Sequence, residues 1–217
     1  MTTWAEMLAE IRADLQDTAV APSTPKWSDQ MLYLYAKDAI RDYSTWFPKR
    51  QDRVEISPTG DAYPLPNDFI EDITVEQPID TYLVRRPNRP GSQYQVTQLA
   101  HFYTVQGGNI YLSSLPTEPI YLSYFCTHPV PTSETDTSAV ITVPDVDIEL
   151  IRVYVKAKVY AQMRGRQSAL DRFKVAGKRD DNPLEPEVGD LMEHYRRKVA
   201  ERLPGGEITL HLVGRSR

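Results

Sequence analysis

Two groups of acidic residues carry the side chains that could hold a divalent metal ion or act as a general acid and base. They are Asp68, Glu71 and Asp72, followed later by Asp145, Asp147 and Glu149. Carboxylate oxygens are ligands for hard cations, and paired carboxylates can divide acid and base roles between them. Both groups also fall at expected turns and helix starts, where acids stabilise the backbone without any chemistry. We favour this structural role and keep a hydrolase as an alternative.

The other reactive residue types are sparse. The four histidines lie far apart and are expected at surfaces or strand edges; they are His101, His128, His194 and His211. The single cysteine, Cys126, excludes an internal disulfide and is expected to pack in a strand rather than to act as a nucleophile. Gly107-Gly108 lacks the Gly-Lys of a phosphate-binding loop. The sequence therefore predicts no catalytic residue, metal or cofactor, and a protein that is not an enzyme.

A run of basic residues could contact phosphates instead. Its members are Arg152, Lys156, Arg164, Arg166, Arg172 and Lys174. Residues 152–206 have a net charge of +5, whereas residues 1–151 have −11. Aromatic residues that would stack on bases are not interleaved with them, and the pI is near 5.4. A solvated face is the favoured interpretation, and a nucleic-acid-binding module that uses the basic helix face of residues 152–179 is the alternative.

These residues need elements to position them, and the clearest element is a helix over residues 27–47. Ser28 is placed to cap it and Pro48 ends it. Its apolar stripe recurs every three or four residues and comprises Leu32, Tyr35, Ala36, Ala39, Ile40, Tyr43 and Phe47. A first helix is expected over residues 4–15. Two amphipathic helices with a short connection usually pack antiparallel.

The character of the chain changes at residue 54. Eleven of the 17 prolines fall between Pro58 and Pro144, a density that excludes long helices and delimits short strands. Gly107-Gly108 predicts a hairpin turn, because glycine accepts positive φ. Residues 120–126 alternate as a strand, and residues 68–76 and 81–86 are further candidate strands. A β-rich domain, sandwich-like or a single antiparallel sheet, is predicted over residues 54–144.

Helical patterns return after Pro144. One helix is expected from about residue 145, then a loop over residues 180–187, then a last helix that ends near Leu203. The predicted fold class is α+β: a helical bundle of residues 1–53 and 145–204, the inserted β-rich domain, and an extended C-terminal arm of residues 205–217. The arm alternates as a strand and is expected to bind a neighbour or partner through Ile208, Leu210, Leu212 and Val213.

Three stretches, taken in this order, resemble a known family. They are KWSDQMLYLYAKDAIRDYSTWFP, AYPLPNDFIEDITVE and GGNIYLSSLPTEPIYLSYFCTHP, and the spacing of Ile141 to Asp145 leads into the next helix as in that family. Over about residues 4–200 the chain is similar to the head-to-tail adaptor (neck, or connector) proteins of tailed bacteriophages.

The resemblance implies a structural virion protein of the neck, made in the host cytoplasm. It would form a ring of 12 copies beneath the portal, extend the DNA channel without sequence-specific binding, and dock the tail or its nozzle. Aromatics beyond the needs of a small core could serve such interfaces; those expected to be exposed are Tyr33, Trp46, Tyr94, Tyr111 and Tyr121. No membrane span is expected, because no apolar run reaches about 20 residues.

Overall fold

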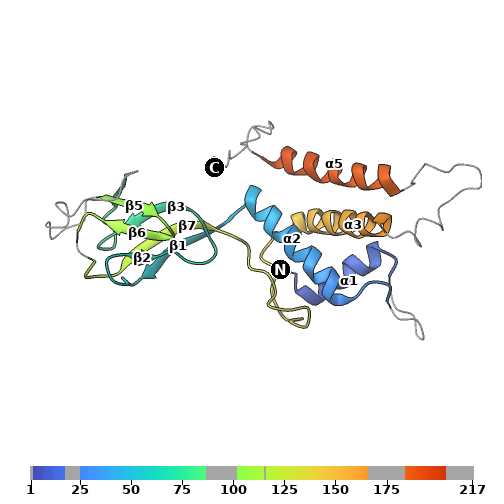
Figure 1. Ribbon diagram of the computed structural model, residues 1–217, viewed down its shortest axis with the longest axis horizontal. Helices are drawn as coiled ribbons and strands as arrows, with labels where there is room; N and C mark the ends of the chain where they lie inside the picture. The colour runs from blue at the N-terminus through green and yellow to red at the C-terminus, as the bar shows by residue number, and fades with distance from the viewer. Residues whose placement is uncertain (1, 18–24, 87–101, 115, 166–183, 204–217) are drawn as a thin grey trace, which may run out of the picture. The chain divides into compact units, whose positions relative to one another are not determined.

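A computed structural model describes residues 2–17, 25–86, 102–114, 116–165 and 184–203 of the 217-residue chain. Over these residues the fold is α+β, with four α-helices and two β-sheets (Figure 1). The chain divides into a helical unit, Met1–Trp46 with His128–Arg217, and a β unit, Phe47–Thr127. Among the described residues, no helix is both long and apolar enough to cross a membrane.

The first two helices are α1, Trp4–Asp14, and α2, Asp29–Trp46, as the sequence predicts. Thr3 and Glu6 form a capping box at the start of α1, each side chain bonding the other residue's backbone N–H. Ser28 caps α2 by accepting a hydrogen bond from the Met31 N–H at 3.3 Å. Side chains at three- and four-residue spacing are buried on each helix; on α2 these are Leu32, Tyr33, Ala36, Ala39, Ile40, Tyr43 and Ser44.

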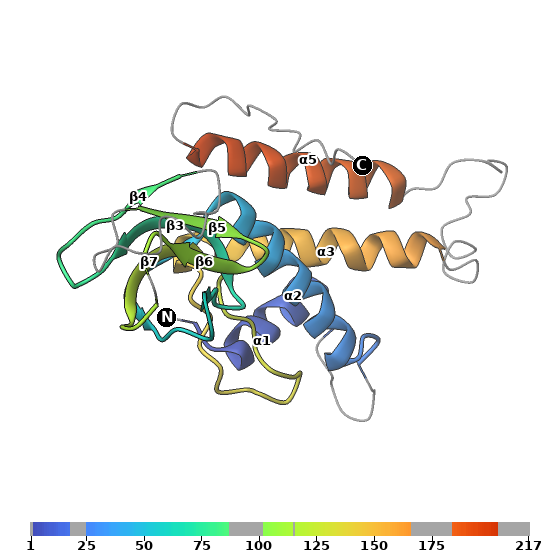
Figure 2. The same cartoon turned by 60° about the vertical axis from the view of Figure 1, so that its left-hand side comes forward.

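The later helices are α3, Ile148–Gly165, which follows a short 3₁₀ turn, η2, Asp145–Asp147, and α5, Leu184–Arg202. Within the helical unit, α3 lies between α5 on one side and α1 and α2 on the other (Figures 1 and 2). This central position agrees with the wide apolar surface of α3. The expected loop over residues 180–187 is wrong from Leu184 onward. Pro186 falls in the first turn of α5, where a missing N–H costs no helical hydrogen bond.

The described residues of the β unit form seven strands in two sheets. The first sheet has the order β1-β7-β3, with β1, Lys49–Ile56, and β3, Phe69–Glu76, each antiparallel to β7, Ile120–Cys126. The second has the order β2-β6-β5-β4. Its strands are β2, Tyr63–Pro64, β4, Val84–Arg85, β5, Phe102–Gln106, and β6, Asn109–Leu112. All pairs are antiparallel except β4 with β5.

Both sheets contribute to one apolar core. Its buried members are Ile56, Tyr63, Val75, Leu83, Tyr103, Ile110, Leu112, Ile120, Leu122, Tyr124 and Cys126. The predicted β5–β6 hairpin is confirmed: Gln106 pairs with Asn109, and the two intervening glycines have φ of +57° and +78°. Only a residue without Cβ accepts both values at no steric cost.

The first strand begins earlier than the sequence pattern indicates. β1 starts at Lys49, and the pattern missed its start because this charged stretch shows little alternation of apolar and polar residues. The segment after β7 belongs with the helices. Its backbone bonds the N-terminus of α1, with the Trp4 N–H donating to the Ala139 carbonyl at 2.8 Å and the Ile141 N–H to the Thr2 carbonyl at 2.9 Å. Backbone pairing of this kind carries no side-chain pattern that a single sequence could display.

Candidate functional site

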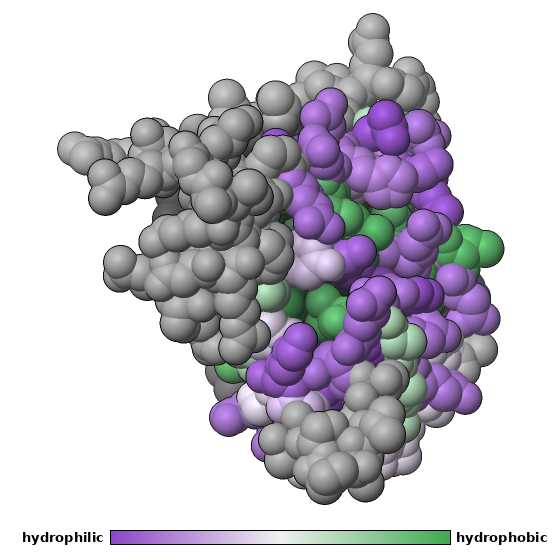
Figure 3. Space-filling model, turned by 90° about the vertical axis from the view of Figure 1, so that its right-hand side faces the viewer, coloured by the Kyte–Doolittle hydropathy of each residue, from purple (hydrophilic) through white to green (hydrophobic). Residues whose placement is uncertain are grey.

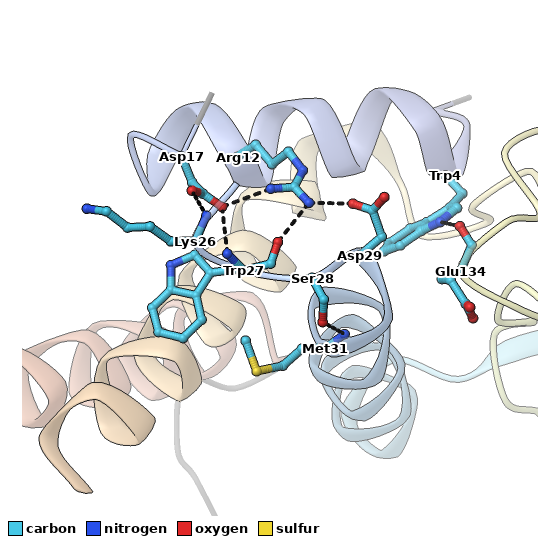
Figure 4. Close-up of polar contacts among 9 residues, drawn as sticks. All are labelled: Trp4, Arg12, Asp17, Lys26, Trp27, Ser28, Asp29, Met31 and Glu134. Carbon is cyan, nitrogen blue, oxygen red and sulfur yellow. Dashed lines mark hydrogen bonds and ion pairs between the residues drawn. The ribbon is translucent and has the colours of Figure 1, made fainter. Parts of the chain in front are cut away.

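The corner between α1 and α2 is built around a buried carboxylate (Figure 4). Asp17 is 5% exposed and accepts hydrogen bonds from the Lys26 and Trp27 N–H groups at 2.7 and 3.2 Å. The Arg12 guanidinium donates to the same side chain at 2.8 Å. A carboxylate out of water is stable when its oxygens are satisfied in this way. These buried hydrogen bonds to Asp17 therefore stabilise the connection between α1 and α2.

Arg12 also connects the corner to the start of α2. Its second terminal nitrogen donates to the Trp27 carbonyl at 3.0 Å and pairs with the Asp29 carboxylate. Each residue of the Trp-Ser-Asp motif thus has a separate structural role: Trp27 is buried, Ser28 caps α2, and Asp29 pairs with Arg12. The sequence pattern did not indicate Arg12 or Asp17, because charged residues at a helix end are most often solvated.

Three of the six acids that could do chemistry are hydrogen-bonded to tyrosines. In the β unit, Tyr124 donates to Asp68 at 3.2 Å, and Tyr103 donates to Asp72 at 2.5 Å. In the helical unit, Tyr43 donates to Asp147 at 2.6 Å. Asp68, Asp72 and Asp147 therefore stabilise packing between elements. Glu71 and Asp72 lie inside β3, not at a turn, since that segment pairs with β7.

The remaining acids have similar roles. Asp145 accepts a hydrogen bond from the Thr2 hydroxyl at 3.0 Å, which lowers the pKa of the Asp145 carboxyl, and Glu149 lies exposed in the first turn of α3. Asp147 also pairs with Arg202, whose guanidinium donates to the Val146 carbonyl at 2.9 Å. Within the described ranges, no three His, Cys, Asp or Glu side chains are grouped to hold a metal ion.

Burial changes the titration of the tyrosines. Loss of hydration raises the pKa of Tyr43, Tyr103 and Tyr195, because the phenolate loses more solvation than the phenol. The same cause, together with the charge of Asp68, raises the pKa of Tyr124 to about 12. These phenols stay protonated as hydrogen-bond donors over the whole neutral range.

Of the six basic residues that could contact phosphates, two have described side chains, and both of these interact with other residues of the chain. Arg152 donates to both Asp14 oxygens at 2.7 and 2.6 Å and to Glu10 at 3.2 Å, and these bonds raise the Arg152 pKa. Lys156 lies over the Tyr160 ring at 5.4 Å. The side chains of Arg164, Arg166, Arg172 and Lys174 lie outside the described residues. The Arg152 charge is thus offset by α1, which weakens the phosphate-binding interpretation.

The histidine and cysteine predictions have mixed outcomes. Cys126 is 1% exposed in β7, as predicted, and burial raises the pKa of its thiol. The surface prediction for His128 is wrong: the ring packs on Tyr43 and lies within 2.9 Å of the Thr142 hydroxyl. His194 is partly exposed on α5, and His101 and His211 lie outside the described residues.

The candidate interface aromatics are not all exposed. Tyr33 is buried, with 7% exposed, and its hydroxyl donates to the Pro131 carbonyl at 2.9 Å, so the expected exposure is wrong for this residue. The segment that follows β7 covers it. Trp46, Tyr111 and Tyr121 are partly exposed. Tyr94 and the arm residues Ile208, Leu210, Leu212 and Val213 lie outside the described residues.

Trp46 borders a groove of about 560 Å³ between α2, α3 and α5. The groove is lined by Asp42, Trp46, Tyr154, Met192, Tyr195, Arg196 and Val199. Tyr195 donates to Asp42 at 2.6 Å and packs edge-on against Tyr154, with ring centroids 5.5 Å apart, which fixes the floor. In the view of Figure 3 most of the described surface is hydrophilic, with apolar side chains showing between hydrophilic ones. An apolar, partly open groove is a binding feature.

The comparison with known protein families identifies one match. The family described as SU10 adaptor protein matches residues 2–185, which is more than half of the chain. The matched range contains the α1–α2 corner, the β unit and α3, and it ends in the first turn of α5. Among curated proteins, none matches the chain.

Proposed function

Because this chain belongs to the SU10 adaptor protein family, we propose that it is the head-to-tail adaptor of a tailed bacteriophage, a structural virion protein of the neck. Membership confirms the resemblance found in the sequence motifs. In this proposal, 12 copies of the chain form a ring between the portal and the tail. Its channel extends the path of the DNA, which passes without sequence-specific contact.

The family match is the observation that carries this proposal, and the contacts of the described residues support it. The corner between α1 and α2 is fixed by the buried pair of Arg12 and Asp17. Of the six acids that a hydrolase could use, four are hydrogen-bonded to phenols or hydroxyls: Asp68, Asp72, Asp145 and Asp147. Such interactions stabilise each unit separately, and a ring subunit requires stable units that present surfaces.

The proposed partners are the portal ring, a tail or nozzle protein, and further copies of this chain. The groove that contains Trp46 is a candidate contact of the helical unit, because aromatic residues are enriched where protein surfaces meet. Tyr111 and Tyr121 are candidate contacts of the β unit. The C-terminal arm, through Ile208, Leu210, Leu212 and Val213, is proposed to bind the portal or a neighbour after assembly starts.

Native mass spectrometry of the chain with its cognate portal ring tests the adaptor function. The chain is measured alone and with the portal, each time with and without residues 205–217. A stoichiometric ring of this chain on the portal is the expected result, and its loss on truncation would assign the arm to portal binding. Absence of portal binding, together with steeply salt-dependent DNA binding, would instead favour the nucleic-acid alternative.

A further inference from the structure

The groove beside Trp46 has a rigid floor. Tyr195 is 3% exposed and Val199 is 3% exposed on α5, and the Tyr195 phenol is fixed by Asp42 of α2. Trp46 at the end of α2 and Met192 on α5 are partly exposed at its sides. The groove therefore offers apolar surface that the described residues leave uncovered, and its volume is within the roughly 300–1,000 Å³ of ligand-binding pockets.

We propose that residues 207–213 of the same chain occupy this groove before assembly, running back along α5. Helix α5 ends at Arg202, and Pro204-Gly205-Gly206 follow directly, residues that favour a reversal of direction. Ile208, Leu210 and Leu212 recur at every second position, which places them on one side of an extended segment. This apolar row is the part that enters the groove.

The lengths agree. Met192 and Val199 are seven positions apart on α5, a rise of about 10 Å along a helix. From Ile208 to Leu212 an extended chain covers about 13 Å. The tether from Leu203 is only a few residues long, which gives the segment an effective concentration in the millimolar range beside its own groove. A second copy would have to compete with that concentration.

Charges also match this direction. The exposed surface of α5 is acidic in its first half, at Glu187, Asp190 and Glu193. Its second half is mainly basic, at Arg196, Arg197 and Arg202, although Glu201 is exposed there and pairs with Lys198. A segment that runs back along the helix places Glu207 at the basic end and carries Arg215 and Arg217 to the acidic end. Opposite charges meet at both ends, whereas a parallel course would oppose like charges.

Acrylamide quenching of tryptophan fluorescence tests the proposal on the isolated chain, without portal or tail. Trp4 and Trp27 are 0% and 5% exposed, so the quenching reports chiefly on Trp46. Removal of residues 204–217 is expected to raise the quenching constant about twofold, because a filled pocket shields most of the surface it contacts. Trp46→Phe should abolish this difference, and circular dichroism should show unchanged helix content.

Matched variants identify the segment. Leu210→Asp with Leu212→Asp should reproduce the truncation, whereas Thr209→Asp, on the other side of the extended segment, should not. A peptide of residues 205–217 added to the truncated chain should restore the shielding. Equal quenching of full-length and truncated chains would overturn the proposal, and so would shielding that disappears on dilution, which would assign the groove to a second copy. The adaptor function would stand in either case, since it is measured by portal binding.

Discussion

Tyr195 on α5 donates its phenolic hydrogen to Asp42 on α2 at 2.6 Å, although 153 positions separate the two residues in the chain. The Tyr195 side chain is buried and is also in edge-on contact with Tyr154 of α3. One side chain thus contacts both of the other helices that form the groove. Its loss should weaken the attachment of α5 to the rest of the helical unit.

Tyr195→Phe is expected to lower the free energy of unfolding by about 1–2 kcal/mol, because the ring stays while Asp42 loses a hydrogen bond. Urea unfolding followed by circular dichroism measures the change. Tyr160→Phe on α3, where the ring is partly exposed beside Lys156, is the matched control and should stay within about 0.5 kcal/mol of the parent. Equal effects of the two variants would contradict a specific role for the Tyr195–Asp42 bond.

Asp17→Ala should be the most damaging change at the α1–α2 corner. It leaves two backbone N–H groups without their acceptor in a buried site and removes one of the acceptors of the Arg12 guanidinium, at an expected cost of about 3 kcal/mol. Thermal unfolding and Trp27 fluorescence report the loss. Asp38→Ala, which removes an exposed carboxylate from α2, is the control and should change stability by less than about 0.5 kcal/mol.

The buried phenols predict a loss of stability in alkaline solution. The pKa of Tyr124 is raised to about 12 from an ordinary value of 10.0. The folded state therefore holds this proton more tightly than the unfolded state, so the contribution is complete below pH 10 and is lost as the pH rises toward 12. Tyr103 and Tyr195 act in the same direction. Urea unfolding between those two pH values should show the decline, and Tyr124→Phe should make it shallower.

Two glycine substitutions should have opposite signs. Gly108 has a φ of +78°, so Gly108→Ala should cost about 1 kcal/mol in the β5–β6 turn. Gly189 lies inside α5 with no atom near the site of an added Cβ, so Gly189→Ala should stabilise that helix by about 0.5–1 kcal/mol. Melting temperatures of the two variants measure both effects. A stabilising Gly108→Ala would be incompatible with the I′-type turn.

Local signals in the sequence were sufficient for some of the elements. Ser28 and the apolar stripe behind it predict α2, and Gly107-Gly108 predicts the hairpin, because caps and positive-φ turns depend on a few neighbouring residues. The burial of Tyr33 and His128 depends on contact between α2 and a segment about 90 residues away in the chain, which no local pattern encodes. Pro186 illustrates the same limit. A proline can lie in a loop or in the first turn of a helix, and the local sequence does not distinguish the two.

The sequence predicts the candidate site less well than it predicts the fold. The sequence predicts Trp46 as an interface residue, and that role stays a prediction. The groove around it requires contact between α2, α3 and α5, which the sequence does not show. Asp68, Asp72 and Asp147 are the types that catalysis uses, and nothing in their spacing shows that a tyrosine from a distant element donates to each. A carboxylate's partner is a property of the tertiary fold.

The pairing of the Trp4 N–H with the Ala139 carbonyl also sets an order of events during synthesis. The β unit is contiguous from Phe47 to Thr127, so every partner of its core has left the ribosome before the later helices exist. Helices α1 and α2 emerge first, yet their partners Glu134, Ala139 and Asp147 emerge more than 100 residues after the residues that they bind. Domains generally fold as units as the chain grows. We therefore expect the middle of the chain to fold first, and the N-terminal helices to pack fully only after residues 134–147 have been synthesised.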